Sequence, residues 1–205
     1  MTVPRGSNVS DAWDAWRSRI DLNEYHVRWQ RMKQRGEASH GEADFIESLA
    51  EARQPTSVLD AGCGMGRVAI ELHRRGIDVE GADLDDELLA FARADAPHIT
   101  WHHGDLATML FGRSYRLIAM PGNVMLFCRA DDRAKIVANL ASHLEDDGLL
   151  VAGFSLDSSP GALTLSEYDM ACTEAGLALV DRFATWERAP YVGGTYAVSA
   201  HRKMR

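Results

Sequence analysis

The sequence has no long apolar run and only three cysteines. Although 46% of its 205 residues are apolar, no window approaches the roughly 18 consecutive apolar residues that a membrane-spanning helix needs. Cys63, Cys128 and Cys172 are widely separated and show neither a disulfide framework nor metal-ligand spacing. The first residues also lack the apolar stretch of a secretory signal. We therefore expect a cytoplasmic protein with free thiols, no bound metal and no membrane partner.

Positive charge is also scarce. The chain carries 22 Lys and Arg against 30 Asp and Glu, a formal net charge of −8. A protein that binds nucleic acid normally presents a basic face to the phosphates, so nucleic acid is not the expected partner. The length fits one globular domain with a full core, residues 1–205, and no repeat, low-complexity tract or linker indicates a second domain.

The middle of the chain alternates between strand-like and helix-like segments. Short apolar stretches predict strands at residues 57–60, 78–82, 99–102, 115–120 and 148–154. Apolar residues at helical spacing predict helices at residues 67–75, 87–95 and 131–144, with one turn near 107–110. Repetition of strand, helix and strand implies parallel pairing with right-handed crossovers. We therefore predict an α/β fold with an open, Rossmann-like sheet and helices on both faces.

The N-terminal segment is predicted to be a helical cap over residues 1–54. Aromatic and apolar residues at helical spacing indicate two helices over residues 9–33, broken near Asp21 and Asn23, and a third over residues 41–53. The aromatic side chains of the first two helices are expected mainly to pack this cap against the rest of the domain.

The remaining chain divides into two parts. Residues 55–154 form the cofactor-binding half, and residues 155–205 form a C-terminal unit that begins with a loop. That unit contains a predicted helix at 165–175 and two strands at 178–186 and 195–201. Because no helix separates these two strands, we expect them to pair antiparallel.

The most informative segment is residues 57–66, Ser-Val-Leu-Asp-Ala-Gly-Cys-Gly-Met-Gly. Gly62, Gly64 and Gly66 follow a strand and precede a helix, and glycine lets a backbone turn sharply and approach a ligand closely. A strand, a glycine turn and a helix N-terminus together make a nucleotide-type binding site. The spacing differs from the Gly-x-Gly-x-x-Gly of dinucleotide sites. Asp60 beside the turn would repel a pyrophosphate but suits a ligand that carries positive charge.

Two further carboxylates follow the next strands. Asp83 ends the second strand, where a carboxylate can accept hydrogen bonds from both hydroxyls of a ribose. Gly104-Asp105-Leu106 follows the third strand. A carboxylate next to a backbone N–H can bind the amino group and a ring nitrogen of an adenine together.

These residues resemble the class I S-adenosylmethionine-dependent methyltransferases. The resemblance rests on Asp60-x-Gly62-x-Gly64-x-Gly66, Asp83 and Asp105 in this order and spacing, and extends from about Ser57 to the C-terminus. It implies a seven-stranded sheet that is mostly parallel with an antiparallel last strand. It also implies S-adenosyl-L-methionine as cofactor and S-adenosyl-L-homocysteine as product.

The resemblance further implies a role for each motif. Asp60 and the glycine loop would approach the methionine part, Asp83 would take the ribose hydroxyls, and Asp105 with the Leu106 N–H would take the adenine. The implied cofactor-binding residues are Asp60, Gly62, Cys63, Gly64, Gly66, Asp83, Leu84, Gly104, Asp105, Leu106 and Met120.

The sequence indicates no catalytic residue. The fourth strand runs into Met120-Pro121-Gly122-Asn123 and lacks the acid that many family members have there, so no general base is assigned. Asn123 is open to two interpretations: it orients an acceptor, or it opens a turn or caps a helix. His40 is likewise open between a cap and a contact with the donor or acceptor.

A small-molecule acceptor is the preferred hypothesis, because a chain of 205 residues leaves little room for a separate recognition domain. Two alternatives stay open. One is an NAD-dependent oxidoreductase on a Rossmann sheet, which Asp60 and the glycine spacing disfavour. The other is a binding module that keeps the S-adenosylmethionine site without turnover.

Overall fold

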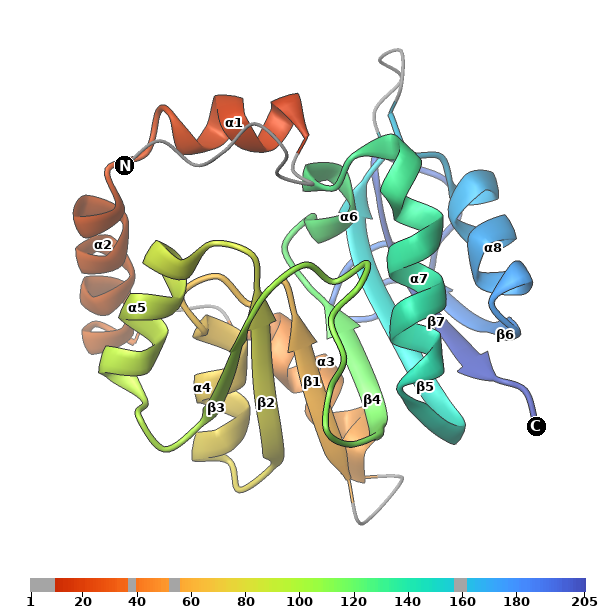
Figure 1. The fold of residues 1–205 in the computed structure, drawn as a ribbon, viewed down its shortest axis with the longest axis horizontal. Helices are drawn as coiled ribbons and strands as arrows, with labels where there is room; N and C mark the ends of the chain where they lie inside the picture. Colours follow the sequence, from red (N-terminus) through yellow and green to blue (C-terminus); the bar gives the residue numbers. More distant parts are fainter. Residues whose placement is uncertain (1–9, 37–39, 52–55, 157–161) are drawn as a thin grey trace.

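A seven-stranded sheet lies at the centre of the structure (Figure 1). The computed structural model describes residues 10–36, 40–51, 56–156 and 162–205. Most of the loop predicted at 155–161 and the end of the helix predicted at 41–53 lie outside these residues. The strands are β1 (Ser57–Ala61), β2 (Asp78–Asp83), β3 (Thr100–His103), β4 (Tyr115–Met120), β5 (Leu144–Ser155), β6 (Leu177–Phe183) and β7 (Tyr196–Lys203).

The strand order is β3-β2-β1-β4-β5-β7-β6. The pairs among β1 to β5 are parallel, whereas β7 runs antiparallel to both β5 and β6. The prediction of a mostly parallel Rossmann-like sheet with an antiparallel last strand is confirmed. From β1 the chain builds β2 and β3 on one side, and then crosses back to add β4 on the other side of β1. This reversal places a ligand-binding crevice at the carboxyl end of β1.

Most helices occur close to the residues at which the sequence predicts them. The helices are α1 (Asp11–Arg17), α2 (Leu22–Gln34), α3 (Gly41–Glu51), α4 (Arg67–Arg74), α5 (Asp86–Asp95), α6 (Val124–Phe127), α7 (Arg133–Ser142) and α8 (Leu165–Glu174), with a 3₁₀ turn at Ala130–Asp132. The helix predicted over 131–144 is therefore split between this turn and α7. The single-turn helix α6 was not predicted. None of the helices in the described ranges has the length and apolar character to cross a membrane.

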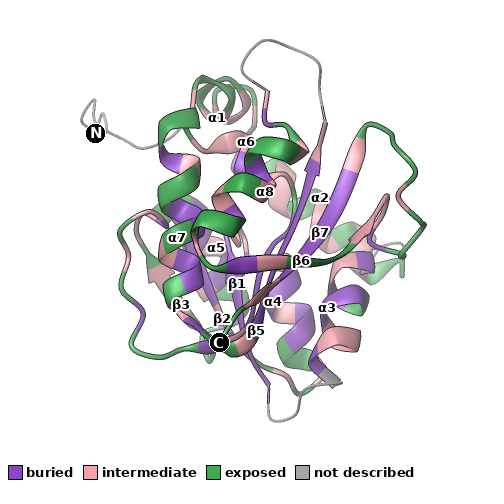
Figure 2. Cartoon of the chain, turned by 90° about the vertical axis from the view of Figure 1, so that its right-hand side faces the viewer, coloured by how far each residue is buried: buried purple, intermediate pink, exposed green. Residues whose placement is uncertain are grey.

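Alternate residues of the strands face two separate hydrophobic cores, as the period of two in a strand requires. In β4, Leu117 and Ala119 pack in the core that includes α3 and α4, whereas Ile118 and Met120 pack in the core that includes α7 and α8. Figure 2 shows the central strands buried between exposed helix surfaces. Both faces of the sheet are thus covered, which leaves the strand ends as the site for a ligand.

Candidate cofactor site

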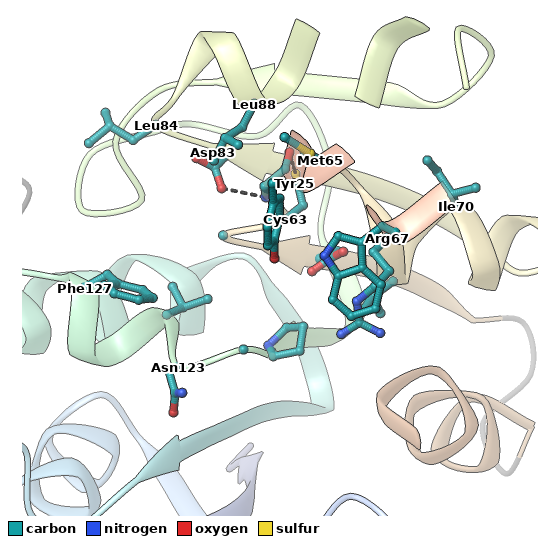
Figure 3. A pocket seen from close by; sticks show the side chains of 18 of the residues that line it. Tyr25, Cys63, Met65, Arg67, Ile70, Asp83, Leu84, Leu88, Asn123 and Phe127 are labelled. Atoms are coloured by element: carbon teal, nitrogen blue, oxygen red, sulfur yellow. Dashed lines mark hydrogen bonds between the residues drawn. The ribbon is translucent and has the colours of Figure 1, made fainter. Parts of the chain in front are cut away.

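A cavity of about 580 Å³ lies at the carboxyl ends of β1, β2, β3 and β4. Eight of the predicted cofactor-binding residues line it: Asp60, Gly62, Cys63, Gly64, Asp83, Leu84, Asp105 and Leu106. The structure therefore brings together residues from three separate motifs around one space. Figure 3 shows two of these motifs, with Cys63 of the glycine loop beside Asp83 and Leu84. The cavity is of the size that small-molecule and cofactor sites usually have.

The glycine loop between β1 and α4 needs glycine at Gly62 and Gly66, because each has a left-handed backbone and a close neighbour where a Cβ would lie. Gly62 has φ +81°, and a Cβ there would lie 2.5 Å from Cγ2 of Val124. Gly66 has φ +78°, and a Cβ there would lie 3.1 Å from Cβ of Ala92 and closer still to the Trp101 ring. The backbone N–H groups of Gly62 and Cys63 both donate to the Ala82 carbonyl, at 2.7 and 3.0 Å, and so fasten the loop to β2.

Asp60 is a buried carboxyl group with one oxygen unused. Its Oδ2 accepts a hydrogen bond from the Ala69 N–H at 3.0 Å, whereas its Oδ1 has no partner among the described residues. Burial raises the pKa of Asp60 to about 7. A cationic ligand group at Oδ1 would satisfy this oxygen and favour the carboxylate.

Asp83, at the end of β2, is a buried carboxyl group that holds two backbone segments. Its Oδ2 accepts from the Gly64 N–H at 2.7 Å (Figure 3), and its Oδ1 accepts from the Asp85 N–H at 2.9 Å. Burial raises its pKa above the usual value. Each carboxylate oxygen has more than one lone pair, so both oxygens can accept a further hydrogen bond from a ligand hydroxyl.

Asp105 and Leu106 follow β3 and form the far side of the cavity. Asp105 Oδ1 accepts from the Ala107 N–H at 2.9 Å, which fixes the carboxyl group in a turn. The Leu106 carbonyl accepts from the Asn139 side chain at 2.9 Å, and its side chain is buried. With Leu84, these residues offer both apolar surface and polar groups at one end of the cavity.

Three predicted residues do not line the cavity. Gly66 caps α4 and packs on Trp101. Gly104 donates its N–H to the Asp83 carbonyl at 3.0 Å. Met120 is fully buried in the core with α7 and α8. These three residues lie behind the residues that line the cavity. After Met120, the next residues, Pro121 and Gly122, do line it.

Five aromatic residues that sequence reasoning assigned to packing, or did not consider, also line the cavity. They are Trp13, Trp16, Tyr25, Trp29 and Phe127, which we call the aromatic wall. Ring centroids lie 5.0 Å apart for Trp13 and Trp16, 5.5 Å for Trp13 and Phe127, and 6.2 Å for Tyr25 and Trp29. All five are only partly buried. The aromatic side chains of α1 thus pack against Phe127 of α6, as expected for the cap, and the structure adds that the same rings line the cavity.

Polar groups stand beside the aromatic wall. Arg67 pairs with Glu42 at 2.5 Å and lies over the Trp29 ring, with 5.0 Å between its guanidinium carbon and the ring centroid. His40 Nδ1 is buried and has no hydrogen-bond partner among the described residues. His40 also lines the cavity.

Asn123 holds the loop after β4 in place. It has a left-handed backbone with φ +66°, at the residue before α6. Its Oδ1 accepts from the Ser155 N–H at 2.8 Å, and Figure 3 shows its side chain directed away from the glycine loop. Of the two interpretations open from the sequence, the structure favours the structural one.

Comparison with known proteins agrees with this fold and site. The family described as "Methyltransferase domain" matches residues 58–148. A TehB-like SAM-dependent methyltransferase from Corynebacterium glutamicum is 32% identical, with a TM-score of 0.78 over 89% of this chain and 97% of that chain. The chain therefore belongs to the S-adenosylmethionine-dependent methyltransferases, enzymes whose methyl donor is S-adenosyl-L-methionine. The family and cofactor predicted from the sequence are confirmed.

Two curated relatives align with part of the chain. A dTDP-3-amino-3,4,6-trideoxy-alpha-D-glucopyranose N,N-dimethyltransferase from Streptomyces venezuelae is 31% identical over 57% of this chain and 51% of its own length. A magnesium-protoporphyrin O-methyltransferase from Rhodobacter capsulatus is 33% identical over 48% of this chain and 45% of its own length. The chain thus spans about half the length of these relatives.

Proposed function

We propose that this protein transfers a methyl group from S-adenosylmethionine to a small-molecule acceptor bound in the same cavity. The observation that carries the proposal is the convergence of Asp60, Asp83 and Asp105 beside the glycine loop. These carboxyl groups lie at or just after the carboxyl ends of three adjacent strands, so a single extended ligand would contact all three. A nucleoside with a cationic amino acid arm has complementary groups at all three.

Each carboxyl group has a proposed partner on the donor. Asp83 accepts the ribose hydroxyls with the lone pairs that Gly64 and Asp85 leave unused. The free Oδ1 of Asp60 receives the ammonium of the methionine part, directly or through water. Asp105 and the Leu106 N–H bind the adenine edge, while the Leu84 and Leu106 side chains contact its faces.

Methyl transfer depends more on the alignment of donor and acceptor than on a catalytic side chain. A lone pair of the acceptor attacks the methyl carbon, the carbon–sulfur bond breaks, and its electron pair neutralises the sulfonium. The neutral thioether released from a sulfonium is a good leaving group, so holding the two reactants in line would supply most of the acceleration. A general base is needed only when the acceptor must lose a proton. The Pro121–Gly122 turn and the aromatic wall shape the space in which this alignment occurs.

Three features support a small-molecule acceptor. Trp13, Trp16, Tyr25 and Trp29 of the aromatic wall come from α1 and α2, the part of the proposed helical cap (residues 1–54) that narrows access to the cavity. The third helix of this segment, α3, packs on one face of the sheet instead. The formal net charge of −8 disfavours nucleic acid. The two curated relatives carry names that specify an amino sugar nucleotide and a porphyrin. A ring with an apolar face would pack well on Trp and Phe side chains.

The experiment is a turnover assay that measures S-adenosylhomocysteine release. Purified protein with S-adenosylmethionine would be offered separate pools of amino sugar nucleotides, porphyrins and aromatic amines or phenols. We expect release above the acceptor-free rate in at least one pool. Donor binding with no release from any pool would instead support a non-catalytic binding module.

The affinity for S-adenosylhomocysteine should depend on pH through Asp60. Its pKa is about 7 without ligand because the group is buried. Since the ligand ammonium pairs with the carboxylate, binding releases a proton below this pH and none above it. We expect affinity to rise about tenfold from pH 6 to pH 8, measured by calorimetry in buffers of different ionisation enthalpy. In Asp60→Asn this dependence should disappear, and an unchanged slope would refute the assignment.

A further inference from the structure

The short helix α1 is held in place at its two ends. None of its seven residues is buried, so no hydrophobic core fixes its position. Its inner surface consists of Trp13 and Trp16, which line the cavity. Figure 1 shows α1 at the carboxyl-end side of the sheet, above the strand ends. Its position must therefore depend on the contacts at its ends, together with the ring contacts of the aromatic wall.

The N-terminal end of α1 is tied to α6. The Ser10 N–H donates to the Phe127 carbonyl at 3.1 Å, and Ser10 Oγ donates to the Leu126 carbonyl at 3.4 Å. Ser10 Oγ also accepts from the Trp13 N–H at 3.2 Å, as a helix N-cap does. One end of α1 is thus fixed to the segment that follows β4.

The C-terminal end of α1 is tied to α5, on the other side of the strand-order reversal. Arg17 Nε lies 3.2 Å from Asp85 Oδ2, and Arg17 Nη2 also pairs with Glu87. Asp85 uses its other oxygen, Oδ1, to cap α5 by accepting from the Glu87 and Leu88 N–H groups. The Asp85 side chain is only 15% exposed and that of Arg17 28%, so the pair is partly shielded from solvent.

This ion pair is linked to the proposed ribose site. The backbone N–H of Asp85 donates to Asp83 Oδ1, and the other oxygen of Asp83 accepts from the Gly64 N–H. A continuous series of hydrogen bonds therefore joins Arg17 to the carboxylate that is proposed to hold the ribose. Through Arg17, α1 is thus joined to Asp85, the residue whose N–H holds the Asp83 carboxylate.

We propose that Arg17 is a positioning residue that holds α1 closed over the bound donor. Arg17 is not among the residues that line the cavity, and it acts through Asp85 and through the placement of Trp13 and Trp16. Within the described part of the chain, loss of the pair leaves α1 held at Ser10, by ring contacts and by its link to α2, which His26 and Gln30 join to Asp95 of α5. With its C-terminal end freed from Asp85, the cavity opens more often and bound donor or product escapes faster. This inference rests on the proposed donor site.

The test compares Arg17→Gln with Arg93→Gln. Arg93 lies on α5, which Asp85 caps, and pairs with Asp86 at 2.7 Å; in the described structure it forms no ion pair with α1 and does not line the cavity. Dissociation of S-adenosylhomocysteine would be followed by stopped-flow tryptophan fluorescence. For a partly exposed pair we expect dissociation about fivefold faster in Arg17→Gln, no change in Arg93→Gln, and an intermediate rate in Arg17→Lys, which keeps the charge but lacks the forked geometry.

The possible outcomes separate the two proposals. Wild-type dissociation rates in Arg17→Gln, or equal acceleration in Arg93→Gln, would overturn the role of Arg17 while leaving the donor site intact. Failure of the wild-type protein to bind S-adenosylhomocysteine would overturn both. Melting temperatures without ligand should differ little among the variants, since α1 carries no buried residue.

Discussion

Replacement of Asp83 by alanine should weaken binding of S-adenosylhomocysteine about 100-fold. Two hydrogen bonds from ribose hydroxyls to a charged acceptor would be lost, each worth about 1.5 kcal/mol or more. Asp83 also accepts from the Gly64 and Asp85 N–H groups, so the variant loosens the loop that faces the donor. Calorimetric titration would measure the affinity, and circular dichroism would establish that the fold is retained.

Matched variants separate this effect from a general loss of stability. Asp83→Asn keeps the shape and one carbonyl oxygen, so its affinity should fall about tenfold. Asp78→Ala removes a carboxylate from the opposite end of the same strand, where it pairs with Arg113 at 2.6 Å, and should leave affinity unchanged. Wild-type affinity in Asp83→Ala would count against the ribose assignment.

Gly66→Ala should lower the free energy of unfolding by about 3 kcal/mol. The left-handed backbone at φ +78° disfavours any side chain, and the added Cβ would meet both Trp101 and Ala92. The Trp101 ring also packs against Gly81 on β2, so it has little freedom to retreat. Denaturation by urea, followed by circular dichroism, would measure the change.

Gly76→Ala is the matched control for this prediction. Gly76 lies just beyond the other end of α4 with φ +84°, but a Cβ there would have nothing within 4 Å. It should therefore show the backbone strain alone, about 1 to 2 kcal/mol. Equal destabilisation of the two variants would mean that contact with Trp101 contributes nothing to the requirement for glycine.

The sequence predicted the sheet because its signals are local. β4 was predicted at the residues where it occurs, since its apolar run is short and sharply bounded. β5 begins at Leu144, four residues before the predicted start. Its first residues were missed because Glu145, Asp146 and Asp147 are polar and interrupt the apolar pattern of a strand. α6 was missed because a helix of four residues is too short to show a period.

The proposed donor-binding residues could be predicted from the sequence, whereas the aromatic wall could not. The residues proposed to hold the donor belong to compact motifs directly after strands, so the fold brings them to one edge. The aromatic wall depends on how α1 and α2 pack against α5 and α6, which no local pattern specifies. Aromatic residues at helical spacing in a polar segment were the available signal. That signal is the same for packing and for binding, so the sequence alone favoured the commoner explanation.

A crystal structure of the protein with S-adenosylhomocysteine tests the central claim most directly. We predict the ribose hydroxyls on Asp83, the adenine beside Asp105 and Leu106, and the amino group of the amino acid arm near Asp60 Oδ1. The sulfur should face the space between the Pro121–Gly122 turn and the aromatic wall. Ligand density elsewhere, or a ribose that does not contact Asp83, would contradict the assignment of this cavity as the methyl-donor site.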